Sequence, residues 1–108
     1  MKIIKRNGQE VIFDKEKIIG AIRKANKEVG ELYQISEDAV QSIATSVTEE
    51  CERTGRSIYV EEVQDMVENY LMSIKAFVLA RKYITYRYTR ALVRKSNTTD
   101  AKILTLIE

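Results

Sequence analysis

The sequence predicts an α+β fold that is mostly α, in which an N-terminal β-hairpin caps a four-helix bundle. Two short runs rich in Ile, Val and Phe flank Asn7-Gly8 near the start of the chain, which is typical of a hairpin. Four later stretches repeat apolar residues every three or four positions, as helices with one buried face do. The 108 residues contain no proline and only four glycines, which favours long helices, and this length allows one compact core.

The hairpin is predicted to turn at Asn7-Gly8, the dipeptide preferred in two-residue type I′ turns. Such a turn pairs Ile3 with Ile12 across the two strands. It also places Lys5 and Arg6 on opposite faces of the ribbon, because successive strand residues alternate. A two-stranded ribbon is only marginally stable alone, so we expect it to lie on the helices.

Four helices are expected after the hairpin. The first follows the N-cap Asp14 and runs to about residue 26, and the second lies between the N-cap Ser36 and the C-terminal stop Gly55. The third is expected over about residues 60–72 and the fourth over about residues 76–95. The spacing of apolar residues predicts that the fourth helix buries Phe77, Ala80, Tyr83, Ile84, Tyr88 and Ala91.

The chain is predicted to divide into one domain over residues 1–95 and a following segment over residues 96–108. The sequence Ser96-Asn97-Thr98-Thr99-Asp100 is typical of a linker. After it come apolar residues without an evident partner: Ile103, Leu104, Leu106 and Ile107. We therefore expect these residues to begin a further segment of a longer, truncated polypeptide. The alternative is that this last turn packs back on the bundle.

Composition argues against catalysis by this chain alone. It has no histidine, the commonest acid–base catalyst and metal ligand, and a single cysteine, Cys51, excludes an internal disulfide and a multi-thiolate metal site. The glutamates beside Cys51 disfavour a reactive thiolate. Glu61, Glu62 and Asp65 are better explained as first-turn acids that complement a helix dipole than as metal ligands, so no metal site built by side chains is expected.

No secretory or membrane-spanning segment is expected. The first six residues are too short and too charged for a signal peptide, and no apolar run approaches the roughly 20 residues that a membrane span needs. We therefore expect the chain to be cytoplasmic.

Charge is distributed unevenly along the chain. Residues 1–30 carry eight basic and four acidic side chains, residues 31–70 carry two basic and ten acidic ones, and residues 71–108 carry eight basic and two acidic ones. If the two basic ends meet in the fold, they form an anion site.

Three cations near the N-terminus are the best candidates for a phosphate site. Lys5 and Arg6 lie beside the hairpin turn, and Lys17 lies in the first turn of the next helix, near its positive end. Together they would hold a triphosphate. The sequence has no P-loop motif, and charge alone does not distinguish such a site from a solvated hairpin tip.

Three landmarks in order resemble the ATP-cone family. Ile3-Ile4-Lys5-Arg6-Asn7-Gly8, followed by Phe13-Asp14 and Lys17-Ile18, is similar to the hairpin and first helix of those proteins. Residues 58–68 are similar to the family's third helix. Residues 80–87 resemble its closing Ala-x-x-Tyr-x-x-Tyr-Arg pattern.

The resemblance implies that residues 1–95 form a regulatory domain that senses adenine nucleotides. Such cones sit at the N-terminus of ribonucleotide reductases, where ATP and dATP compete for one pocket and switch the enzyme between active and inhibited states. The implied ligand is ATP or dATP with Mg²⁺, and the implied partners are the catalytic domain of a parent reductase and further copies of the chain. Residues 97–104 are similar to the join into the catalytic domain of the anaerobic, glycyl-radical class.

The resemblance also implies roles for individual residues. The phosphates would meet Lys5, Arg6 and Lys17, joined by Arg87 or Arg90 from the fourth helix. Apolar walls around adenine would come from Ile3, Phe13 and Ile18, with an ordinary core position as the alternative, which we expect to hold for part of each side chain. The other candidates on the base and ribose side are Asn7, Val11, Asp14, Val60 and Gln64, with Val11 limited to a backbone contact.

Three other functions stay open. Cones also occur in a zinc-ribbon repressor of reductase genes, so a nucleotide-responsive transcriptional regulator is one alternative, although that repressor carries four cysteines ahead of its cone and this chain begins with the hairpin. A nucleic-acid-binding helical module is another, but the acidic residues of 31–70 argue against nucleic acid as a partner. A plain helical interaction domain would bind no nucleotide.

Overall fold

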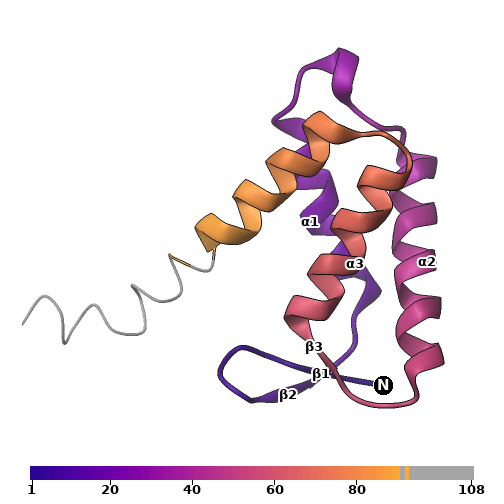
Figure 1. The fold of residues 1–108 in the computed structure, drawn as a ribbon, viewed down its shortest axis with the longest axis vertical. Helices are drawn as coiled ribbons and strands as arrows, with labels where there is room; N and C mark the ends of the chain where they lie inside the picture. The colour runs from indigo at the N-terminus through magenta and orange to yellow at the C-terminus, as the bar shows by residue number, and fades with distance from the viewer. Residues whose placement is uncertain (91, 93–108) are drawn as a thin grey trace, which may run out of the picture.

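Three short strands and four helices make up the part of the chain that this computed structural model describes, residues 1–90 and residue 92 (Figure 1). Their order is β1 (Lys2–Ile4), β2 (Glu10–Ile12), α1 (Lys15–Lys27), a 3-10 turn (Glu31–Tyr33), α2 (Glu37–Thr54), β3 (Ile58–Tyr59), α3 (Val60–Ser73) and a fourth helix over residues 77–90. The predicted mostly helical α+β fold is confirmed. The predicted linker and following segment, residues 96–108, lie outside the described residues.

Local sequence signals set the helix ends as predicted. The Asp14 side chain accepts a hydrogen bond from the N–H of Glu16, and the Ser36 side chain accepts one from the N–H of Ala39. Each cap satisfies an N–H group that the first helical turn leaves without an intrahelical partner. α2 ends at Gly55, whose φ of 67° lies in the left-handed region that glycine adopts without strain.

The register of the hairpin differs from the prediction. Ile3 lies opposite Val11, where the type I′ turn would have placed Ile12. That turn needs a positive φ at both central residues, and of the two only Gly8 has one, 85°. The N–H of Gly8 donates to the carbonyl three residues earlier at 2.9 Å, so a type I turn leads into a left-handed glycine. The one-residue slip turns Ile12 outward, where it is 79% exposed.

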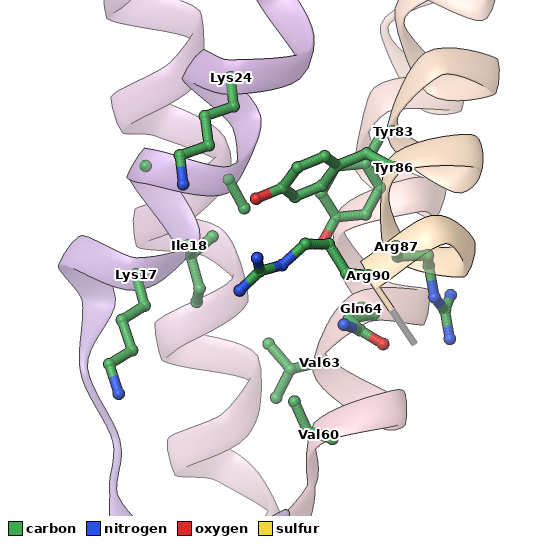
Figure 2. A pocket seen from close by; sticks show the side chains of 12 residues that line it. Lys17, Ile18, Lys24, Val60, Val63, Gln64, Tyr83, Tyr86, Arg87 and Arg90 are labelled. Carbon is green, nitrogen blue, oxygen red and sulfur yellow. The ribbon is translucent and has the colours of Figure 1, made fainter. Parts of the chain in front are cut away.

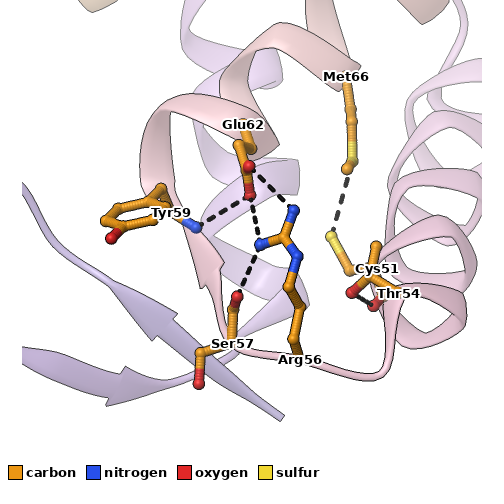
Figure 3. Close-up of polar contacts among 7 residues, drawn as sticks. All are labelled: Cys51, Thr54, Arg56, Ser57, Tyr59, Glu62 and Met66. Atoms are coloured by element: carbon orange, nitrogen blue, oxygen red, sulfur yellow. Dashed lines mark hydrogen bonds and ion pairs between the residues drawn. The ribbon is translucent and has the colours of Figure 1, made fainter.

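A third strand, which the sequence did not predict, extends the hairpin. β3 pairs in parallel with β1, so the strand order is β2-β1-β3. Arg56 holds the connection into α3 by donating to both carboxylate oxygens of Glu62 at 3.1 Å, and Glu62 also accepts from the N–H of Tyr59 at 3.2 Å (Figure 3). The small sheet thus lies at the end of the bundle where α1 and α3 begin (Figure 1).

The fourth helix buries a different face from the predicted one. Its buried side chains are Leu79, Ala80 and Tyr83, whereas Phe77 is 50% exposed and Tyr88 is 67% exposed. The prediction that Ile84 is buried is also wrong, and Ala91 lies outside the described residues. Ala80 and Tyr83 belong to both candidate faces, so apolar spacing alone did not determine how the helix is rotated about its axis.

One apolar core joins the sheet to all four helices. Its most completely buried side chains are Ile19, Ile22, Val40, Val47, Cys51, Ile58, Val67, Leu71 and Leu79. Burial of a Val, Leu or Ile side chain contributes about 1.5–3 kcal/mol, so this core is the main source of stability. It fixes the ends of α1 and α3 relative to the hairpin.

An exposed ion pair between α1 and α2 predicts how stability changes in acid. Arg23 donates to both oxygens of Glu37, and Gln41 donates to the same carboxylate, which lowers the pKa of Glu37 from 4.5 to about 2. A lowered folded-state pKa adds stability that is fully present above pH 4.5 and is lost as the pH falls towards 2. We expect the melting temperatures of wild type and Glu37→Gln, followed by circular dichroism, to converge across this window. A constant difference would contradict the assignment.

Candidate functional site

A cleft of about 190 Å³ lies where the hairpin meets the N-terminal ends of α1 and α3. The side chains that line it are Ile3, Lys5, Arg6, Val11, Ile12, Phe13, Asp14, Lys17, Ile18, Val60 and Val63. Nine of the thirteen residues predicted for the site are among them. The hairpin and α1 are consecutive in sequence, but α3 is distant from both, so the cleft depends on the tertiary fold.

Three cations line this one cleft. Lys5 and Arg6 stand at the hairpin tip, and Lys17 stands in the first turn of α1. Both lysine side chains are exposed, and neither makes an ion pair with another residue in the described part of the chain. Three positive groups beside a helix N-terminus attract a polyanion, because the helix dipole adds to their charge.

Arg6 differs from the two lysines because its guanidinium is already bonded to α3. Its Nε lies 3.0 Å from Glu61 Oε1, and its Nη2 donates to Gln64 Oε1 at 3.1 Å. Gln64 therefore contacts the cation that was predicted to share its site. Glu61 was not among the predicted residues.

The other residues that line the cleft are apolar, apart from one acid. Ile3 and Ile18 are each 8% exposed and belong to the core, so most of each side chain occupies a core position, the alternative named for them. Val11 and Phe13 are half-buried and pack against the same core. Asp14 carries the one carboxylate among the lining residues, and a carboxylate accepts hydrogen bonds from hydroxyl groups but repels phosphate.

A larger hollow of about 490 Å³ adjoins the cleft and shares Lys17, Ile18, Val60 and Val63 with it (Figure 2). It lies between α1, α3 and the fourth helix. The residues that it adds are Gly20, Ala21, Lys24, Gln64, Tyr83, Tyr86, Arg87 and Arg90. Twelve of the thirteen predicted residues line one of the two hollows, so the two basic ends of the chain do meet.

The two arginines of the fourth helix point in different directions. Arg87 pairs with both Asp65 and Glu68 on α3, at 2.9 Å to Asp65, and its side chain is only 18% exposed. Arg90 extends into the hollow towards α1, whereas the Arg87 guanidinium points away from it (Figure 2). Two carboxylates already neutralise Arg87, which leaves Arg90 as the better placed of the two for an anion.

Asn7 is the predicted residue that lines neither hollow. It lies in the hairpin turn, where its side-chain oxygen accepts from the N–H of Gln9 at 2.9 Å. Its contact is therefore with the turn that positions Lys5 and Arg6.

Sequence reasoning missed Lys24, Tyr83 and Tyr86 as lining residues. Lys24 follows Lys17 by seven positions, which returns to the same helix face after two turns, so a helical wheel could have indicated it. Both tyrosines stand in the closing pattern that resembles the ATP-cone family. Burial raises the pKa of the Tyr83 phenol well above its ordinary value, so it stays neutral near the hollow.

Cys51 lines neither hollow, and its surroundings do not activate its thiol. Burial, followed by the charge of Glu50, raises the pKa of Cys51, so its thiol is a poor nucleophile, and its Sγ lies 3.7 Å from Met66 Sδ in the core (Figure 3). Within residues 1–90 and 92, no group of three or more metal-ligating acids, histidines or cysteines comes together. None of the described helices combines the length and the apolarity needed to cross a membrane.

Comparison with known proteins identifies the arrangement. The model of the ATP cone domain matches residues 1–92. The chain is 32% identical to the ribonucleoside-diphosphate reductase subunit alpha of Chlamydia muridarum, over 93% of this chain and 10% of that protein. It is 38% identical to the anaerobic ribonucleoside-triphosphate reductase of Escherichia coli, over 86% of this chain and 12% of that protein. It is 31% identical to the transcriptional repressor NrdR of Petrotoga mobilis, over 85% of this chain and 59% of that protein.

Proposed function

Because this chain belongs to the ATP-cone family, we propose that it binds ATP or dATP in the cleft beneath its hairpin and thereby switches the activity of a ribonucleotide reductase. The ATP cone of ribonucleotide reductases is a regulatory, nucleotide-binding domain. The chain spans about a tenth of the length of the reductases that it matches. We accordingly assign the reaction to a catalytic domain and only its regulation to this chain.

One observation carries the proposal: Lys5, Arg6 and Lys17 line the same cleft. In our assignment these three cations bind the phosphates, and Arg90 joins them from the fourth helix in preference to Arg87. Charge-assisted hydrogen bonds from several cations suit the oxygens of a triphosphate. The neighbouring hollow gives room for the part of the ligand that the smaller cleft does not hold.

The apolar wall suits the base. Ile3, Phe13 and Ile18 would pack against adenine, and Val60 closes the same wall from α3. Val11 would contribute its backbone, and Gln64 would accept or donate a hydrogen bond on the base and ribose side. Asp14 suits a ribose hydroxyl because a carboxylate accepts from O–H groups.

Magnesium would enter with the triphosphate. Mg²⁺ keeps several water ligands and takes the rest from phosphate oxygens, so it needs few protein ligands. Asp14 is the one acid among the lining residues of the cleft and could approach the ion directly or through water. When bound, the ion would neutralise part of the phosphate charge.

The switch follows from what the ligand would connect. Bound phosphates would tie the hairpin tip to α1 and α3 and favour one arrangement of these elements. A ligand shifts such an equilibrium only by its difference in affinity for the two states. ATP and dATP differ by one hydroxyl group, so the energy that discriminates them is on the order of 1–2 kcal/mol. We propose that a catalytic domain and other copies of the chain in the cytoplasm respond to that difference.

A series of melting curves with ATP, dATP, GTP and CTP, each with magnesium, tests the function. We expect ATP and dATP to raise the melting temperature and GTP and CTP to leave it nearly unchanged. A ligand at a hundredfold its Kd adds about 2.7 kcal/mol of stability. Equal, weak shifts with all four nucleotides would instead indicate unspecific anion binding.

A nucleotide-responsive transcriptional regulator is a second candidate, supported by the similarity to a protein named as a repressor. This function requires DNA binding, which the reductase function does not. Retention of duplex DNA by the full-length protein, weakening steeply with salt and changing with ATP, would favour this candidate.

A further inference from the structure

A carboxylate on α3, outside the lining of the cleft, pairs with one of the three cations of the cleft. Arg6 contacts Glu61 through Nε and Gln64 through Nη2, and these two nitrogens form one bidentate edge of the guanidinium. The side chains of Arg6 and Glu61 are 30% and 43% exposed, so water partly surrounds the pair. Lys5 and Lys17 make no such ion pair with any residue that the structure describes.

We infer that Glu61 is an internal counter-ion that occupies the place of a phosphate on Arg6 until the nucleotide displaces it. This inference rests on the proposed function, because it concerns the same cleft. An anion that uses the Nε and Nη2 edge of Arg6 must break the contacts with Glu61 and Gln64. Glu61 therefore lowers the affinity of the site for phosphate, and Lys5 and Lys17 have no equivalent competitor.

The same contact also ties the hairpin to α3 before the ligand arrives. Arg6 lies in the hairpin tip, and Glu61 lies in the first turn of α3, where the helix dipole stabilises its negative charge. Binding exchanges this protein–protein contact for contacts with phosphate. The hairpin tip therefore has two alternative anionic partners, one from the protein and one from the ligand.

Glu37→Gln supplies a matched control for Glu61→Gln. Each glutamate lies in the first turn of a helix, pairs with an arginine from another element and lines neither hollow. They differ in that Glu61 pairs with Arg6, which lines the cleft, whereas Glu37 pairs with Arg23, which lines neither hollow. Each change removes one negative charge and keeps the shape of the side chain. Only the change at position 61 acts on a cation of the cleft.

Isothermal titration with magnesium ATP and with inorganic tripolyphosphate tests the inference. Because exposed ion pairs contribute up to about 1 kcal/mol, we expect Glu61→Gln to bind both ligands roughly two- to fivefold more tightly than wild type. Glu37→Gln should bind them as wild type does. Unchanged or weaker binding by Glu61→Gln, or equal gains in both variants, would overturn the counter-ion role while leaving the proposed function intact. Absence of ATP binding by wild type would overturn both.

Discussion

Replacing Lys17 by alanine is expected to weaken ATP binding by about ten- to a hundredfold. Lys17 lines both hollows and makes no ion pair with any described residue, so its ammonium group is available to phosphate. A hydrogen bond to a charged group contributes about 1.5–3 kcal/mol, and each 1.4 kcal/mol is a factor of ten in affinity. Titration calorimetry with magnesium ATP measures the change.

Lys15→Ala is the control for this experiment. Lys15 has the same charge and lies in the same turn of α1, but its Nζ donates to Thr45 Oγ1 on α2 at 2.7 Å. The Lys15→Ala variant should therefore lose little affinity for ATP. Equal losses in the Lys15 and Lys17 variants would show that only the overall charge of the domain matters.

Replacing Leu71 by alanine is expected to lower the free energy of unfolding by about 2–5 kcal/mol. Leu71 lies on α3 and has no exposed surface, so the truncation leaves a cavity in the core. Urea denaturation followed by circular dichroism gives the change in stability.

Ile12→Ala is the matched exposed substitution. The observed register turns Ile12 to solvent, so its truncation should change stability by about 0.5 kcal/mol or less. The register predicted from Asn7-Gly8 would have placed Ile12 opposite Ile3, on the buried face. A large loss at Ile12 would therefore favour the predicted register over the observed one.

The helix boundaries could be predicted because their signals are local. Asp14 and Ser36 each cap a helix with their own side chains, and Gly55 supplies the left-handed residue that ends α2. The hairpin register was harder to predict from the sequence, because it depends on whether Asn7 adopts a positive φ. Asn7-Gly8 is compatible both with a type I′ turn and with a type I turn followed by a left-handed glycine. β3 has only two residues and pairs with a strand more than fifty positions earlier, so no local pattern indicated it.

The basic residues of the cleft could be predicted because their positions follow from one short hairpin and the helix directly after it. Lys5, Arg6 and Lys17 are close in sequence, and their order matches the ATP-cone pattern. The choice between Arg87 and Arg90 needed the tertiary structure, because it depends on the carboxylates that α3 presents to the fourth helix. The Glu61 contact with Arg6 joins residues 55 positions apart, and neither the charge pattern nor the family resemblance indicated it.

A crystal structure of the domain with ATP and magnesium tests most directly whether three cations share one triphosphate. We predict phosphate oxygens within hydrogen-bond distance of Lys5 Nζ, Lys17 Nζ and the Arg6 guanidinium, with adenine against the apolar wall. Phosphates bound away from the hairpin, with Arg6 still paired to Glu61 and Lys5 in solvent, would contradict the account.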